Sequence, residues 1–213
     1  MTVAKSARGL FRATGKTGGD KPRAADDFYP TPPEPTRALL HAESSALRRF
    51  PAIWEPAAGD GAMVREIEGA GHRVIASDLV DRGAGATVRD FFAYEAPPAP
   101  ALVTNPPFFE CNWRDGRGRW ISHGIDMLGL AYMALLLPWT WPGPAGLGGI
   151  WSRMPPARVY LMRWKIDFTG EGAPPTYHGW FVWDQAAPIA PPALLMLDRA
   201  DARQAELFGE ATE

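Results

Sequence analysis

The sequence contains a single cysteine, Cys111, among 213 residues. One thiol cannot form an internal disulfide, and it cannot build a zinc site that needs several cysteines. The longest apolar run, 130–139, is too short for a membrane-spanning helix and fits a buried strand better. The basic N-terminus also lacks the apolar segment of a secretory signal. We therefore expect a cytoplasmic protein with no membrane association and no metal cofactor.

The net charge of −2 leaves no strong basic excess over the whole chain. Residues 1–23 hold six Lys or Arg residues against one Asp, a local charge of +5, so the remainder carries −7. We expect residues 1–25 to form a flexible basic arm, because they show little apolar periodicity. This arm is compatible with attraction to nucleic-acid phosphates and equally with a solvated leader that binds nothing.

The length suits one full α/β domain, which we place at 26–197, followed by a tail or short helix at 198–213. Apolar runs bounded by turn residues predict strands at 52–55, 72–78, 86–92, 101–104, 131–137, 158–164 and 179–184. Periodic segments between them predict helices at 32–48, 62–70, 121–128 and 150–154. For the first helix, Thr31 and Glu34 fit a capping box with Pro32 at the first helical position.

A glycine loop follows the first predicted strand. Glu55 ends that strand, 56–61 reads Pro-Ala-Ala-Gly-Asp-Gly, and a helix begins at Ala62. A strand, a glycine loop and a helix together cradle nucleotide-like ligands, because glycines permit close approach and a helix N-terminus favours anionic groups. The third glycine of the dinucleotide fingerprint is missing, which disfavours a plain NAD site.

Acidic residues stand at the ends of three successive strands. Glu55 closes the first, Asp78 the second and Asp90 the third. Asp78 comes about twenty residues after the glycine loop, where α/β nucleotide sites place the carboxylate that binds ribose hydroxyls. Any one of these acids could be a solvated loop residue, but the succession is typical of a binding site.

The fourth strand ends in Thr104-Asn105-Pro106-Pro107-Phe108. Asn105 offers an amide oxygen and Pro106 a carbonyl, and the prolines remove backbone donors, so the segment is suited to accept hydrogen bonds. The two N–H groups of an exocyclic amine such as adenine N6 match these acceptors. Phe108 supplies an apolar face on which a base could stack, a contact worth about 1–3 kcal/mol. The alternative interpretation is a proline-rich turn.

Together, the segments Tyr29-x-Thr31-Pro32, 55–61, Asp78, Asp90-Phe91 and 105–108 resemble the class I S-adenosylmethionine-dependent methyltransferases that act on adenine N6 in nucleic acids. Their order is similar to the gamma arrangement of DNA adenine methyltransferases, and the match spans about residues 27–185. The resemblance implies a Rossmann-like α/β fold with helices on both faces. Its sheet would have seven mostly parallel strands, with one antiparallel strand around Phe181 beside the sixth.

The resemblance also assigns roles to residues. Target-base and catalytic roles fall to Asn105, Pro106, Pro107 and Phe108. Binding of S-adenosylmethionine falls to Phe28, Tyr29 and Thr31 at the methionine end, Glu55, Gly59 and Gly61 around the pocket, Asp78 at the ribose, and Asp90 and Phe91 at the adenine. Ala57, Asp60, Leu79 and Asn105 are placed beside the same cofactor.

The function implied by the resemblance is methylation of adenine N6 in DNA after the base has been flipped out. Methyltransferases that recognise a sequence usually carry a separate recognition domain. Here only the loops 109–120 and 165–178 and the two arms remain for that work, so we expect weak specificity or a protein partner. Trp164, Phe168, Tyr177 and Trp180 are candidates for the rest of the base pocket, although most are expected in the core. Compact chains of this kind are common in phage and prophage.

Three alternatives remain open. An RNA adenine methyltransferase would use the same chemistry on unstacked bases. A protein glutamine methyltransferase resembles this site but usually has Tyr at the position of Phe108. A non-catalytic subunit that binds S-adenosylmethionine is disfavoured, because the cofactor acids and Asn105 are all present. The oligomeric state, monomer or homodimer, is left open by the sequence.

Overall fold

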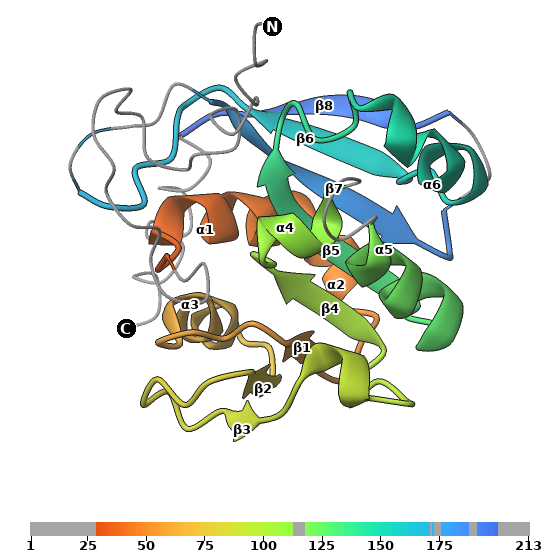
Figure 1. Cartoon of the computed structure of the whole chain (residues 1–213). Coiled ribbons are helices and arrows are strands. Elements are labelled where there is room, and N and C mark those ends of the chain that lie inside the picture. Colours follow the sequence, from red (N-terminus) through yellow and green to blue (C-terminus); the bar gives the residue numbers. More distant parts are fainter. Residues whose placement is uncertain (1–28, 113–117, 171, 173–175, 188–190, 200–213) are drawn as a thin grey trace, which may run out of the picture.

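The computed structural model describes residues 29–112, 118–170, 172, 176–187 and 191–199 (Figure 1). In this part of the chain eight strands form one sheet in the order β3-β2-β1-β4-β5-β7-β6-β8. All run parallel except β7, which is antiparallel to both of its neighbours. The strands are β1 (Ile53–Glu55), β2 (Val74–Asp78), β3 (Thr87–Val88), β4 (Ala101–Thr104), β5 (Tyr132–Pro138), β6 (Arg158–Met162), β7 (His178–Asp184) and β8 (Ala193–Leu197).

Helices cover both faces of the sheet. The side chains of β5 alternate between two separate cores: Tyr132, Ala134 and Leu136 enter one, and the intervening residues enter the other. The first core is closed by α1 (Pro33–Ala42), α2 (Ser44–Leu47) and α3 (Ala62–Gly69). The second is closed by α4 (Phe108–Cys111), α5 (Arg119–Ser122) and α6 (Gly148–Arg153). The predicted α/β fold with two helical layers is confirmed.

The order of the strands reverses between β1 and β4. From β1 the chain adds β2 and β3 on one side, and it then returns to place β4 and β5 on the other. In parallel sheets a ligand binds outside the carboxyl ends of the strands at such a reversal. In Figure 1 the arrowheads of β4 and β5 point toward one side of the molecule and that of β7 points away from it. The topology therefore predicts a ligand site at the carboxyl ends of β1 and β4.

The sheet has one strand more than predicted. The antiparallel strand around Phe181 lies beside β6 as expected, and it is inserted between β5 and β6. The additional strand is β8, which pairs parallel with β6 at the edge of the sheet. Four of its five residues are exposed, so it lacks the alternation of buried and exposed positions that marks a strand in a sequence. The tail 200–213 lies outside the described residues.

The first helix begins differently from the prediction. It starts at Pro33 with Pro32 at the N-cap, and no side chain caps it. Thr31 accepts a hydrogen bond from Asn105 Nδ2 instead (2.9 Å), and Glu34 pairs with Arg199 (2.7 Å). The capping box was therefore wrong, because both of its polar side chains have tertiary partners. The helix also ends early, and the chain to Leu47 forms a second short helix.

Two further elements differ from the prediction. The strand predicted at 86–92 is limited to Thr87–Val88. Phe91–Ala93 forms a 3-10 turn instead, and the Asp90 side chain caps this turn by accepting the N–H of Phe92. The helix predicted at 121–128 begins at Arg119 and continues as a π-helical turn, His123–Met127. Among the described residues, none of the helices has the length and apolar character needed to cross a bilayer.

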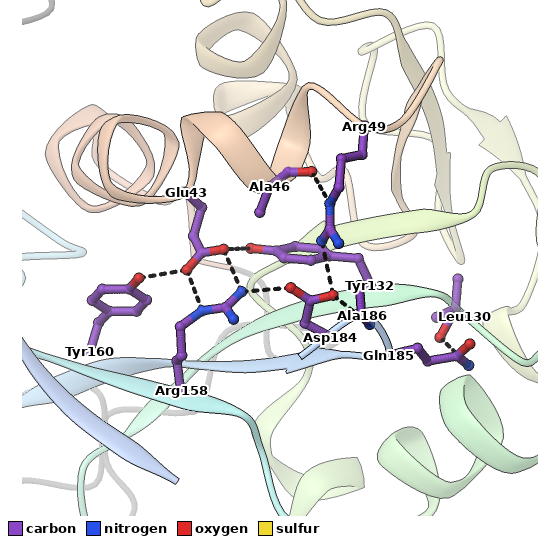
Figure 2. Close-up of polar contacts among 10 residues, drawn as sticks. All are labelled: Glu43, Ala46, Arg49, Leu130, Tyr132, Arg158, Tyr160, Asp184, Gln185 and Ala186. Carbon is purple, nitrogen blue, oxygen red and sulfur yellow. Dashed lines mark hydrogen bonds and ion pairs between the residues drawn. The ribbon is translucent and has the colours of Figure 1, made fainter. Parts of the chain in front are cut away.

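A buried ion pair joins the first helices to the sheet (Figure 2). Glu43, at the junction of α1 and α2, is 3% exposed and accepts two hydrogen bonds from Arg158 of β6, both 2.7 Å. The hydroxyls of Tyr160 (2.5 Å) and Tyr132 (3.3 Å) complete its coordination. Arg158 also donates to Asp184 of β7 (2.9 Å). Glu43, Arg158 and Asp184 thus each pair with a charged residue of another element.

Replacing Arg158 with Met should lower the free energy of unfolding by about 3 kcal/mol, because Glu43 then keeps its burial without its cation. Urea unfolding followed by tryptophan fluorescence measures the loss. Arg163→Met is the matched control: its partner is Asp198, both side chains are more than half exposed, and such a pair contributes less than about 1 kcal/mol. Equal losses in the two variants would contradict the role given to the buried pair.

Candidate functional site

The glycine loop between β1 and α3 is held in shape by its own hydrogen bonds. The N–H of Ala57 donates to Glu55 Oε1 (3.0 Å), and the N–H of Gly59 donates to Asp78 Oδ2 (2.7 Å). Asp60 Oδ1 accepts from the N–H of Ala62, the first residue of α3 (3.0 Å). Gly61 has a φ of +80°, and a Cβ there would lie 3.3 Å from the side chain of Ala84. The loop is preformed, with a shape that requires glycine.

Asp78, at the end of β2, is held rigidly beside this loop. One carboxylate oxygen accepts from Gly59 and the other from the N–H of Val80 (2.9 Å). Leu79, next in the chain, is 61% exposed. The structure thus brings together Asp78 and the loop as the sequence predicted, with an exposed apolar side chain alongside.

The third acid lies at the next strand end, but its aromatic neighbour is in the core. Asp90 follows β3 and caps the 3-10 turn. Phe91 is 3% exposed and stacks on Trp120, with ring centroids 4.0 Å apart. Phe92 is the more accessible ring, with the guanidinium of Arg119 lying 4.2 Å from its centroid. Sequence reasoning did not single out Phe92, because two adjacent phenylalanines give no sign of which one faces inward.

Asn105 leads the turn after β4, and its amide is oriented by a residue far away in the sequence. Its Nδ2 donates to Thr31 Oγ1 (2.9 Å), which lies just before α1. Its Oδ1 is buried and has no hydrogen-bond partner among the described residues. Pro106 is buried, Pro107 is the N-cap of α4, and Phe108 opens that helix with its ring half-buried. A buried acceptor without a donor is costly, so this oxygen is a candidate to accept an N–H from a ligand.

Glu55 connects the two strands at the reversal point. Thr104, the last residue of β4, donates its hydroxyl to Glu55 Oε1 (2.5 Å), and Glu55 Oε2 is buried without a partner among the described residues. Burial raises the pKa of Glu55 to about 8, against the lowering effect of its hydrogen bonds from Thr104 and Ala57. The carboxyl is therefore mainly protonated at neutral pH, with a hydroxyl available on Oε2.

These contacts form one continuous chain. It runs from Thr31 through Asn105 to its neighbour Thr104, on to Glu55 at the end of β1, and through the glycine loop to Asp78. Three segments that are distant in the sequence thus meet at the carboxyl ends of β4, β1 and β2. Tyr29 precedes this chain and packs against the core on the α1 side. Phe28 lies outside the described residues, as do the basic arm 1–25 and 113–117 of the predicted recognition loop.

The candidates for the rest of a base pocket have different positions. Trp180 is fully buried and donates its indole N–H to Pro35 (2.9 Å), and Trp164 packs against the same core. Phe168 is 7% exposed, whereas Tyr177 is 44% exposed. The sequence analysis missed His178, whose ring lies 5.9 Å from that of Phe108. Its only sequence signal is its position at the start of an apolar strand.

No protein-family model and no curated protein matches the sequence. The fold, however, is the Rossmann-like α/β fold of class I methyltransferases, and solved structures share it. A protein of Listeria monocytogenes, provisionally assigned as a class I S-adenosylmethionine-dependent methyltransferase, is 12% identical with a TM-score of 0.52, over 82% of this chain and 67% of that one. A provisionally assigned RNA methyltransferase of Pyrococcus horikoshii is 13% identical with a TM-score of 0.55, over 78% and 91%.

A third match is the methyltransferase subunit of a type I restriction-modification system from Streptococcus thermophilus. It is 11% identical with a TM-score of 0.52, over 74% of this chain. This chain spans only 45% of that subunit's length. At these identities the likeness establishes the fold, and the chemistry has to be argued from the residues.

The raised pKa of Glu55 makes the stability depend on pH. The folded state keeps the proton up to about pH 8, while the unfolded chain loses it near 4.5, so this contribution to stability falls as the pH rises between those values. Glu55→Gln imitates the protonated acid and should remove this contribution. We expect the urea midpoint of the variant, relative to wild type, to rise from pH 5 to pH 8. A constant difference would show that Glu55 is ionised in the folded protein.

Proposed function

We propose that the protein transfers a methyl group from S-adenosylmethionine to the N6 amino group of adenine in DNA. The observation that carries the proposal is the orientation of Asn105: Thr31 holds its amide nitrogen, and its oxygen is left as a buried acceptor without a donor. An acceptor fixed in this way suits an amino group, which has N–H bonds to donate. It would disfavour a carbonyl or phosphate ligand at the same position.

The residues at the strand ends fit the cofactor. Asp78 would bind its ribose hydroxyls, with Leu79 and Asp90 at the adenine, and the glycine loop leaves room for close approach of the backbone. Glu55 fits as a buried, protonated carboxyl whose Oε2 has no partner among the described residues. Phe28, Tyr29, Thr31, Ala57, Gly59, Asp60, Gly61, Phe91 and Asn105 complete the proposed cofactor set, with Phe91 acting from within the core.

The chain's own contribution is to position and polarise the amine. Asn105 Oδ1 and the Pro106 carbonyl would accept one N–H each, which draws the nitrogen lone pair out of conjugation, while Phe108 holds the base. When bound, S-adenosylmethionine supplies the methyl carbon: its S–C bond breaks as the new C–N bond forms, the electron pair stays on sulfur, and the amine releases a proton. Much of the rate then comes from holding the reacting groups in line.

The target base must leave its stack to reach Asn105. Flipping costs a few kcal/mol in a duplex and least in a single strand, so single-stranded or distorted sites should react faster. Sequence specificity would come from 109–120, from 165–178, from the arms, or from a protein partner. The restriction-modification subunit that shares the fold makes a partner a reasonable proposal.

Tritiated methyl transfer from S-adenosylmethionine to single-stranded DNA, duplex DNA, RNA and protein, assayed in parallel, tests the proposal. We expect N6-methyladenine in DNA after digestion to nucleosides. Label in RNA alone would keep the fold and mechanism and change the substrate to the RNA alternative. Label in protein, or cofactor binding without transfer, would favour the glutamine methyltransferase or the non-catalytic subunit.

Asn105→Ala should lower kcat about 10²–10³-fold, the loss that removal of one positioned polar group causes in an enzyme. The dissociation constant for S-adenosylmethionine, measured by calorimetry, should change less than about threefold if the amide acts on the target amine. Gln185→Ala is the control, because its amide donates to Leu130 near the amino end of β5, at the other end of the strands from Asn105. Transfer at the wild-type rate by the Asn105 variant would exclude the mechanism.

A further inference from the structure

His178 is the first residue of β7 and pairs with Pro138 at the carboxyl end of β5. It therefore stands at the same edge of the sheet as Asn105. Its side chain is 1% exposed and lies between two aromatic rings, Phe108 at 5.9 Å and Phe168 at 5.2 Å between centroids. One of these rings belongs to the turn proposed to hold the target base, and the other to the segment between β6 and β7.

The imidazole has an unused hydrogen-bonding atom in this position. Its Nδ1 is buried and has no partner among the described residues. Burial lowers the pKa of His178 to about 4, so the ring is neutral at physiological pH and carries one N–H and one acceptor. A histidine kept only for packing would leave this polar atom at a cost of about 1–3 kcal/mol, which an apolar ring would avoid.

We propose that Nδ1 of His178 donates a hydrogen bond to a ring nitrogen of the target base. The acceptor is N1, which is bonded to the carbon that bears the amino group, or N7, which is one carbon further away. The inference rests on the proposed function, because it takes the base to lie against Phe108. Asn105 and Pro106 recognise the amino group alone, which cytosine also has. A donor from His178 to N7 would add recognition of the purine ring. A donor to N1 would strengthen binding of the base without separating adenine from cytosine, because cytosine N3 offers the same acceptor beside its amino group.

Single-stranded oligonucleotides in which the target adenine is replaced by 1-deazaadenine or 7-deazaadenine test the contact directly, since each lacks one ring nitrogen. Wild-type kcat/KM should fall about tenfold on one of the two, the loss expected for one hydrogen bond with a buried partner left unpaired. Losses below threefold on both would overturn the inference. Single strands remove differences in base pairing from the comparison.

His178→Phe keeps a ring between Phe108 and Phe168 and removes the N–H. On natural adenine its kcat/KM should fall about tenfold, with little change in S-adenosylmethionine affinity, and it should no longer distinguish the sensitive analogue from adenine. Each protein is assayed on the same two substrates, so the intrinsic reactivity of the analogue cancels when the ratios of kcat/KM on adenine and on the analogue are compared between wild type and variant. Undiminished discrimination by the variant would assign His178 a packing role only.

His178→Gln retains an N–H donor and should recover at least part of the lost kcat/KM, which a packing role alone does not predict. If His178→Phe does not fold, the wild-type comparison can still overturn the inference through losses below threefold on both analogues, and His178→Gln supplies the comparison between proteins. Failure of the proposed function has a different result: wild type would transfer no methyl group to adenine in any oligonucleotide, and the inference would fall with it. Wild-type activity without analogue discrimination would overturn the inference alone.

Discussion

The hydrogen bond from Thr104 to Glu55 joins the ends of β4 and β1, the two strands between which the sheet reverses its order. The connections that follow two such neighbouring strands leave in opposite directions, which opens a crevice outside the carboxyl ends of the strands. This contact ties them inside the protein, where both side chains are fully buried. The glycine loop leaves from one end of the bond and Asn105 from the other, so the distance between the two proposed ligand sites depends on it.

Buried polar groups have hydrogen-bond partners at one region of the fold and lack them at another, among the described residues. At the junction of α1 and α2, Glu43 meets Arg158 and two tyrosine hydroxyls, so its charge is fully paired. At the proposed site, buried atoms of Glu55, Asn105 and His178 have no partner among the described residues. Unpaired buried groups cost stability, and a ligand or a water molecule can complete their pairing. The Glu43–Arg158 pair joins elements of the scaffold, whereas the unpaired atoms of Glu55, Asn105 and His178 lie at the strand ends that form the proposed site.

The sequence was sufficient for features with a local signature. The bounds of β4 and the start of α3 follow from an apolar run and a glycine loop, and the acids at the strand ends follow from the regular alternation of strand and helix. What it could not show depends on contacts across the chain. Thr31 fits a capping box until Asn105 is beside it, and β8 is recognisable as a strand only because β6 offers it an edge. His178 has no local signature, since its role comes from the two rings around it.

The fold that this chain shares with solved methyltransferases does not determine which substrate it acts on. Structures only 11–13% identical to this chain share its fold, and they include a restriction-modification methyltransferase subunit and a provisionally assigned RNA methyltransferase. The acids proposed to bind the cofactor, Glu55 and Asp78, end β1 and β2, whereas Asn105 follows β4 and His178 begins β7. Substrate choice can therefore change there without disturbing the hydrogen-bonded loop that would hold the cofactor.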